Sequence, residues 1–333
     1  MTRNIEEIVN QDLALSAAGL ATADGTDDHV AVLLGLYNGS ATLTAQIESL
    51  VGQTHRNWSL IVSDDGSTDD SIARLARLAS SMPRNATHLI RGPGTGFAQN
   101  FLTLARAAGP MVPYAAFCDQ DDVWLPQKLS RALDQLKSIP PGRPALYAAR
   151  TVICDEDLRP LRRSPLFEKP PAFANALVQS IGGGNTMMLN RAALDILQAA
   201  SLHAKGIVAH DWWVYQVVTG AGGIAIYDPE PSVLYRQHGS NLVGANDTVR
   251  ASVQRAVQVM RGRFGQWNDS NIAALEAAAH FLTPEARKTL SLFREVREAS
   301  LGHRMKALRR SGLYRQTRRG NLALWVAALT RRL

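Results

Sequence analysis

From residue 29 onward, short apolar runs alternate with stretches of helical periodicity, and this alternation limits the possible folds more than any other feature. An apolar run of about four to eight residues is typical of a buried strand, whereas apolar residues three and four positions apart indicate a helix. We therefore expect four strands joined by three helices, in the segments 30–39, 41–53, 58–66, 68–81, 86–92, 96–109 and 112–122. Strands that alternate with helices predict an α/β fold with a mostly parallel central sheet.

The second of these helices carries polar residues at its expected start. Ser67 or Thr68 is predicted to be its N-terminal cap, because a side-chain hydroxyl there can accept a hydrogen bond from the first turn. Asp69 and Asp70 would then lie in the first turn and interact favourably with the helix dipole. That role is structural and needs no ligand.

Other acidic residues stand at the ends of two predicted strands. Asp64 and Asp65 follow one strand directly, and the acidic stretch 119–122 follows another. Ligands of open parallel sheets bind beyond the carboxyl ends of the strands, so both clusters are predicted to line one crevice. A carboxylate at the tip of a strand, such as Asp65, can accept a hydrogen bond from the N–H of a pyrimidine base.

The spacing of Asp119 and Asp121 suits a hard divalent cation, Mg²⁺ or Mn²⁺, that also binds phosphate oxygens. A cation would offset the charge of three carboxylates in a short stretch. The alternative is a solvated acidic turn in which Asp122 caps a helix over 126–137. That alternative explains Asp122 but not all three acids.

Composition indicates a globular protein. The chain has 333 residues, of which 46% are hydrophobic and 20% charged, so it can bury a large core. Cys118 and Cys154 lie in apolar stretches and are expected to be buried free thiols, which fits a reducing compartment. Residues 1–28 have acids where a secretory signal would be basic and are expected to form a loose leader. No run approaches the roughly 18 apolar residues of a membrane span, so we expect a cytoplasmic protein.

The net charge of +7 is unevenly distributed. Residues 250–333 hold 17 Lys and Arg against 5 Asp and Glu, which predicts a boundary near residue 245 and a basic helical extension over 246–333. Within it, 285–308 has the spacing of an amphipathic helix that packs on the α/β domain. The final stretch, 309–333, combines arginines with apolar residues and suits the surface of an anionic membrane. Solvated helix faces would explain the same charges.

Several motifs in order carry a resemblance to a known family. "AVLLGLYNGSATLTAQIESLVGQTHRNWSLIVSDDGSTDDS" and "FCDQDDVWLPQKL" resemble the nucleotide-binding half of the inverting family 2 glycosyltransferases, which have the GT-A fold. "GGGNTMMLNR", "HDWWVYQVV" and "LYRQHGSNLVG" resemble the rhamnosyltransferase branch of that family. The similarity covers about residues 29–245, with the nucleotide-sugar half at 29–125 and the acceptor half at 126–245.

The resemblance implies a nucleoside-diphosphate sugar donor, a divalent metal on its diphosphate, and one displacement that inverts the anomeric carbon. Asp121 would be the principal metal ligand, and His238 would contact the metal or diphosphate. The residues that would meet the donor are Tyr37, Asn38, Asp64, Asp65, Asp119, Gln120 and Arg236. In the loop 91–100 the family's usual basic residue before Asn100 is replaced by Gln99, so only a loose donor-side role is expected there.

The resemblance also implies a catalytic base. Asp211 matches the family's catalytic aspartate and would take the proton of the acceptor hydroxyl, although its position also suits a helix cap. The residues expected on the acceptor side are Gly183, Gly184, Asn185, His210, Trp212 and Trp213. Two alternatives stay open, since His210 could simply pack and the glycines could form a tight turn.

We therefore expect a metal-dependent transferase that moves L-rhamnose from dTDP-rhamnose to a glycan or lipid-linked acceptor in surface polysaccharide synthesis. It would act in the cytoplasm, with a peripheral place on the inner face of the membrane as one option. A UDP-sugar donor is the alternative. A nucleotidyltransferase is more remote, because the first strand ends in "LYNGS" and not in a basic phosphate loop. Zinc-binding or helix-turn-helix spacing is absent from the sequence, so no nucleic-acid partner is expected.

Overall fold

The structure is a computed structural model that describes residues 28–79, 82, 87–237 and 263–333. A nine-stranded sheet runs through these residues in the order β3-β2-β1-β4-β8-β6-β9-β5, with β7 paired to β6. The strands are β1 (Val30–Leu36), β2 (Trp58–Asp64), β3 (Thr87–Arg91), β4 (Tyr114–Cys118), β5 (Val123–Trp124), β6 (Ala145–Cys154), β7 (Pro160–Arg163), β8 (Met188–Asn190) and β9 (Ile224–Arg236).

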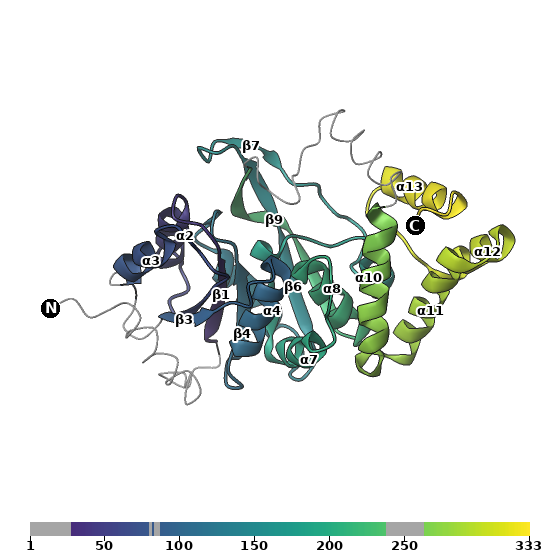
Figure 1. Ribbon diagram of the computed structural model, residues 1–333, viewed down its shortest axis with the longest axis horizontal. Helices are drawn as coiled ribbons and strands as arrows, with labels where there is room; N and C mark the ends of the chain where they lie inside the picture. The colour runs from purple at the N-terminus through teal and green to yellow at the C-terminus, as the bar shows by residue number, and fades with distance from the viewer. Residues whose placement is uncertain (1–27, 80–81, 83–86, 238–262) are drawn as a thin grey trace.

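Helices pack on the sheet and extend beyond one end of it (Figure 1). They are α2 (Leu43–Val51), α3 (Ser71–Ala79), α4 (Phe97–Ala107), α5 (Lys128–Lys137), α6 (Phe173–Ala176), α7 (Arg191–Ser201), α8 (His210–Gly220), α10 (Arg263–Ala277), α11 (Pro284–Glu298), α12 (Leu301–Ser311) and α13 (Arg318–Leu329), with short 3-10 turns η1 (Gly184–Thr186) and η2 (Ala279–Phe281). Among the described residues, none of these helices is both long and apolar enough to cross a bilayer.

The four strands expected from the first 122 residues are confirmed. β1 pairs in parallel with β2 and with β4, and β2 pairs in parallel with β3. Nearly every side chain of β1 and β2 is buried, because helices cover both faces of a parallel sheet, and this explains their continuous apolar runs. The register sets Leu36 opposite Asp64 and Leu34 opposite Cys118, so the acidic residues that follow these strands emerge at one edge.

The second half of the sheet is mixed. β8 runs antiparallel to both β4 and β6, while the long strand β9 runs parallel to β6. β5 follows the acidic stretch 119–122 directly and pairs antiparallel with β9, which sets Val123 opposite Leu234. This pairing places the acidic stretch beside Arg236 at the end of β9.

The predicted start of the second helix is wrong. α3 begins at Ser71, not near Ser67 or Thr68. The Asp69 carboxylate accepts hydrogen bonds from the backbone N–H of Ser71 and of Ser40, each at 3.0 Å. Asp69 therefore precedes the helix and connects its start to the loop after β1.

The segment 285–308 was expected to be one helix, and this expectation is also wrong. The chain forms α11 and α12, separated at Ala299 and Ser300. Ser300 has extended backbone (φ −62°, ψ 159°), the conformation usual for the residue that precedes a helix, so the helical direction changes there. Leu301, which would have continued the apolar face, is 55% exposed.

The expectation that this segment packs on the α/β domain is confirmed. Phe293 of α11 is 1% exposed and belongs to one continuous apolar cluster with Val214 of α8 and Phe117 of β4. The backbone N–H of Thr283 also donates to the carbonyl of Gly220 at the end of α8, at 2.9 Å. Figure 1 shows the carboxy-terminal helices at the opposite end of the molecule from α2 and α3. Cys118 and Cys154 are buried free thiols, as expected.

This shared core gives a stability prediction. Replacing Phe293 with Ala should lower the free energy of unfolding by about 3–5 kcal/mol, because a cavity remains where a buried ring was removed. Leu301→Ala is the control, since its side chain is exposed and the change should cost at most about 0.5 kcal/mol. Chemical denaturation followed by circular dichroism measures both. Equal effects of the two substitutions would show that α11 contributes no core.

Candidate functional site

Three carboxylates gather in the short connection between β4 and β5. Asp119, Asp121 and Asp122 each offer an oxygen within 4.8 Å of the others. Asp122 is fully buried, and its two oxygens accept hydrogen bonds from the side-chain amide of Asn185 and from the backbone N–H of Arg236. The alternative in which Asp122 caps the helix after it is wrong, because its partners lie on η1 and β9, far along the chain.

Burial and mutual repulsion raise the pKa values of this cluster. The pKa of Asp119 lies well above its usual range, first because of burial and then because of the charges of Asp122, Asp121 and Asp211. Burial, followed by the charge of Asp121, raises the pKa of Asp122 to about 7. The ionised form of both carboxyl groups is therefore disfavoured at this site unless positive charge is added.

This donor set fits a hard divalent cation. Carboxylate oxygens are the ligands that Mg²⁺ and Mn²⁺ prefer, and a cation would relieve the repulsion that raises the pKa values. Asp122 is fully buried and held by two hydrogen bonds, whereas Asp119 and Asp121 are partly exposed, so the latter two are the residues that would hold the ion. Mg²⁺ keeps several of its waters, so two protein carboxylates suffice.

Asp211 brings a fourth carboxylate to this edge. It lies in the first turn of α8 and accepts a hydrogen bond from the backbone N–H of Trp212 at 2.6 Å. Burial raises its pKa to about 6. Since its charge also raises the pKa of Asp119, it lies within electrostatic reach of the cluster although the two are far apart in sequence. A carboxylate with this pKa can accept a proton near neutral pH.

Gln120 ties the ends of two neighbouring strands together. Its side-chain amide accepts a hydrogen bond from the backbone N–H of Tyr37 at 2.8 Å and donates to the carbonyl of Tyr37 at 2.9 Å. A Cβ on Gly39 would come within 2.5 Å of the Gln120 side-chain amide, so a larger residue there would push this amide away from Tyr37. The Tyr37 side chain is 57% exposed at this edge.

The loops after β1 and β2 are joined by side-chain to backbone hydrogen bonds. Asn38 has a left-handed backbone (φ 48°), and its side-chain oxygen accepts from the N–H of Thr68 at 2.8 Å. The Asp64 carboxylate accepts from the N–H of Ser67 at 3.2 Å. These contacts place Asn38 and Asp64 in one connected group of loops.

Asp65 joins a third loop to this group. Its carboxylate accepts hydrogen bonds from the backbone N–H of Gly94 at 2.7 Å and of Gly96 at 3.0 Å. Both glycines have positive φ, a conformation that L side chains rarely adopt. The glycine loop after β3 is thus held against Asp65, a contact that the sequence analysis did not predict.

His210 has the packing role that was left open. Its side chain is 4% exposed and stacks on Phe101, with ring centres 4.0 Å apart, while Phe117 meets it edge-on. Burial lowers the pKa of His210 to about 3, so the ring is neutral at physiological pH. A Cβ on Gly184 would lie 2.2 Å from Nε2 of His210. A side chain at position 184 would therefore clash with the buried ring. Gly183 and Gly184 lead into the tight turn η1, in agreement with the turn alternative.

The two tryptophans expected on the acceptor side are buried. Trp212 is 7% exposed, and its indole N–H donates to the carbonyl of Ala176 at 2.6 Å. Trp213 is fully buried in the apolar cluster, so its side chain packs and lines no open surface. Asn185 points to Asp122, as its hydrogen bond shows, and so supports the carboxylate cluster.

Arg236 brings positive charge to the cluster, and His238 lies outside the described residues. The Arg236 Nε–H donates to the backbone carbonyl of Asp121 at 2.9 Å, and another guanidinium N–H donates to the carbonyl of Glu156. The charge of Arg236 works against the rise in the pKa of Asp122.

Sequence reasoning missed Lys128. This first residue of α5 is 1% exposed, and the charges of Asp122 and Asp119 act on its ammonium group. A lysine shortly after a proline resembles any solvated residue at a helix start. The only signal was its place on the helix that follows the acidic stretch.

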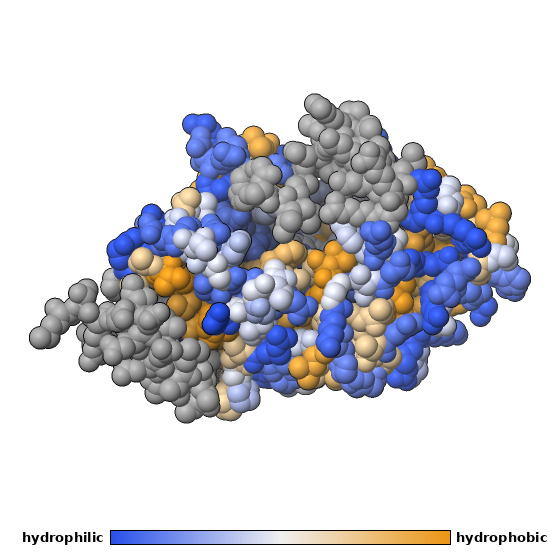
Figure 2. Space-filling view, viewed as in Figure 1, coloured by the Kyte–Doolittle hydropathy of each residue, from blue (hydrophilic) through white to orange (hydrophobic). Residues whose placement is uncertain are grey.

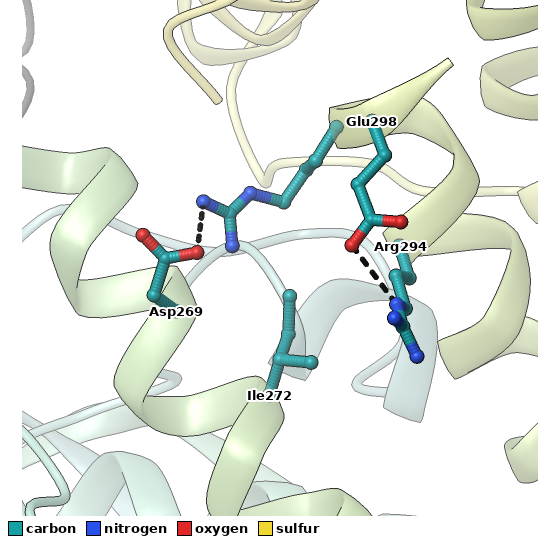
Figure 3. A pocket seen from close by; sticks show the side chains of 5 residues that line it. Asp269, Ile272, Arg294 and Glu298 are labelled. Atoms are coloured by element: carbon teal, nitrogen blue, oxygen red, sulfur yellow. Dashed lines mark hydrogen bonds and ion pairs between the residues drawn. The ribbon is translucent and has the colours of Figure 1, made fainter.

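A small cavity of about 140 Å³ lies elsewhere, between α10 and α11 (Figure 3). Its charged side chains are paired with one another. Arg297 contacts Asp269 at 2.6 Å, and Arg294 contacts Glu298 at 2.9 Å. This cavity therefore offers a ligand little unpaired charge and is not the candidate site.

Comparison with known proteins finds similarity to glycosyltransferases. Residues 31–196 match the model of the family described as glycosyl transferase family 2. The dTDP-rhamnosyl transferase RfbG of Shigella flexneri is 26% identical over 67% of this chain and 77% of its own length. The UDP-Glc:alpha-D-GlcNAc-diphosphoundecaprenol beta-1,3-glucosyltransferase WfgD of Escherichia coli is 32% identical over 33% of this chain and 42% of its own.

Among solved structures, Staphylococcus aureus TarS 1–349 in complex with UDP-GlcNAc matches with a TM-score of 0.49 and 14% identity. That match covers 86% of this chain and 93% of TarS 1–349.

A mostly parallel sheet with a carboxylate cluster at its strand ends, and with Asp211 within electrostatic reach of it, fits a glycosyltransferase. The chain belongs to glycosyltransferase family 2.

Proposed function

We propose that the protein transfers L-rhamnose from dTDP-rhamnose, with inversion at the anomeric carbon, to a glycan or lipid-linked acceptor in surface polysaccharide synthesis. The observation that carries the proposal is the approach of Asp211 to the Asp119–Asp122 cluster, because it unites a base and a cation site at one edge. The dTDP-rhamnosyl transferase among the relatives supports the choice of donor.

The donor would lie across the loops that follow β1, β2 and β3. Tyr37 and Asn38 would contact the nucleoside, together with Asp64 and Asp65. Asp65 would also shape the pocket indirectly, because it holds the glycine loop in place. Arg236 would add positive charge beside the diphosphate.

Asp119 and Asp121 would hold Mg²⁺ or Mn²⁺, and His238 is proposed as a further contact of the metal or diphosphate. A bound cation supplies charge neutralisation for the diphosphate as it departs. Asn185 and the backbone of Arg236 keep the neighbouring carboxylate of Asp122 in position by hydrogen bonds. The buried setting strengthens each of these electrostatic interactions.

Asp211 would act as the general base. As the acceptor oxygen forms its bond to the anomeric carbon, the bond from that carbon to the diphosphate oxygen breaks, and its electron pair leaves with the diphosphate. The proton of the acceptor hydroxyl passes to the Asp211 carboxylate. Attack opposite the leaving group inverts the anomeric centre. His210 and Trp213 lie beside Asp211 at the start of α8. Their buried side chains would hold this turn, and with it Asp211, in place.

A UDP-sugar donor is the second candidate. The relative WfgD is named as a UDP-Glc transferase, and a pyrimidine site accepts uridine as readily as thymidine. A nucleotidyltransferase remains a more distant alternative.

We also propose that the reaction takes place at the inner, cytoplasmic face of the membrane, with α13 as the contact surface. Leu322, Val326 and Leu329 are 67%, 48% and 50% exposed and lie one helical turn apart on one side of α13. Leu324 and Ala328 on the other side are buried. Both sides of α13 thus carry apolar residues, and among the described residues only the side with Leu324 and Ala328 is buried.

The charges around this stripe suit an anionic bilayer. From residue 299 to residue 333 the sequence contains nine Lys and Arg and no Asp or Glu. Arg318 and Arg319 precede the stripe and Arg331 and Arg332 follow it, and all four are exposed. Figure 2 shows apolar and hydrophilic residues side by side at the end of the molecule where α13 lies. An apolar stripe flanked by arginines is typical of helices that lie in the plane of a membrane surface.

The donor assignment predicts which nucleotide sugar is consumed. With Mn²⁺ or Mg²⁺ and a glycan acceptor, the protein should release dTDP from dTDP-rhamnose at least about tenfold faster than UDP from UDP-glucose, because dTDP-rhamnose is the proposed donor. Coupled detection of the released diphosphate measures both rates, with EDTA as the control. Faster release of UDP would favour the second candidate, and metal-independent release would contradict the cation site.

Asp211→Asn should lower kcat by about 10²–10⁴-fold, because the amide cannot take up the acceptor proton. In the wild-type protein, kcat should rise with pH through about 6 and level off above it, since Asp211 must be ionised to act and burial raises its pKa to about 6. Thermal melting of Asp211→Asn controls for loss of fold. A variant that is folded and fully active would remove Asp211 from catalysis.

The membrane assignment predicts a loss of vesicle binding. Replacing Leu322, Val326 and Leu329 together with Ser should abolish flotation with vesicles rich in phosphatidylglycerol, because the apolar face is then lost. Met111→Ser with Leu202→Ser is the matched control, since both side chains are 68% exposed on the catalytic half. Binding should weaken in high salt and with phosphatidylcholine alone. Equal flotation of the triple variant and the control would contradict the assignment.

A further inference from the structure

Lys128 is a buried cation without the partners that burial normally requires. Its side chain is 1% exposed, and within the described part of the chain its Nζ has no hydrogen-bond partner. The Nζ lies 3.7 Å from the ring centre of Trp124, which is itself 2% exposed. A buried ammonium group is costly unless other charges compensate it. The ring face offers part of that compensation.

The remaining compensation comes from the carboxylate cluster. Burial lowers the pKa of Lys128 to about 7, while the charges of Asp122 and Asp119 act in the opposite direction. Conversely, the charge of Lys128 works against the rise in the pKa of Asp119. The ammonium therefore acts from the buried ring of Trp124, which shares an apolar cluster with Cys118, while Arg236 approaches from β9.

We propose that Lys128 is the internal counter-ion of the Asp119–Asp122 cluster. Its ammonium group balances the carboxylates when no cation is bound, and it weakens the binding of a cation by repulsion. This inference rests on the proposed cation site. It makes Lys128 a positioning residue, because its ammonium acts through the carboxylates and touches no substrate. A cation held weakly in this way exchanges readily and binds most firmly together with the diphosphate of the donor.

The direction of the change in cation affinity distinguishes the proposed role of Lys128 from a purely structural one. If Lys128 only supports packing, its replacement loosens the cluster and weakens the binding of a cation. If it repels the cation, replacement with an uncharged residue of similar shape strengthens binding. Removing one unit charge close to a divalent ion in a partly buried site should tighten binding on the order of tenfold.

The test is Mn²⁺ binding to the full chain without any donor, followed by electron paramagnetic resonance of free Mn²⁺. Lys128→Met keeps the apolar stem and removes the charge, and its Kd should be lower than that of the wild-type protein on the order of tenfold. Lys137→Met is the matched control on the same helix, because the side chain of Lys137 is 46% exposed and its Kd should not change. Asp121→Ala should abolish binding.

Thermal melting provides a second readout. In EDTA, Lys128→Met should melt below the wild-type protein, since its carboxylates lack a counter-ion, and Mn²⁺ should raise its melting temperature more than that of the wild type. Lys128→Gln serves if the methionine variant fails to fold.

An unchanged or higher Kd in a folded variant, with binding still abolished by Asp121→Ala, would overturn the role of Lys128 alone. If the wild-type protein shows no saturable Mn²⁺ binding, the proposed cation site fails together with this inference.

Discussion

The rest of the site depends on the concentration of negative charge at one partly buried edge of the sheet. Burial raises the pKa of Asp119, Asp122 and Asp211, because the ionised carboxylate of each is less stable here than in water. The fold keeps them together because Asn185 and the backbone of Arg236 donate hydrogen bonds to Asp122. A cation bound at this edge would relieve that repulsion and could then hold a diphosphate.

The sequence predicted the order of the first four strands because a strand covered on both faces must be apolar throughout, and that signal is local. It also predicted that the acidic residues share an edge, because parallel strands end on the same side. Periodicity could not place Asp211 near Asp119. That approach depends on how the chain between the two residues folds, including β6, η1 and β8. Only the family resemblance linked the two residues, and their electrostatic interaction agrees with it.

Other features depend on contacts that no local pattern reveals. The apolar spacing of 285–308 continues through Ser300, so the sequence alone does not indicate the break between α11 and α12. The glycines at 183 and 184 suit an open binding surface as well as a tight turn, and only the burial of His210 decides between these roles. Lys128 resembles a surface lysine until β5 and α5 are placed in the fold, where its ammonium becomes buried.

The packing of α13 constrains how an acceptor reaches the site. Leu324 and Ala328 belong to the same apolar cluster as Val214 of α8, the helix whose first turn carries Asp211. The helix α13 and the helix that carries Asp211 therefore share one packed core. Any surface on which α13 rests fixes the height and tilt of Asp211 above it, and so restricts incoming hydroxyl groups to a narrow range of distances from that surface.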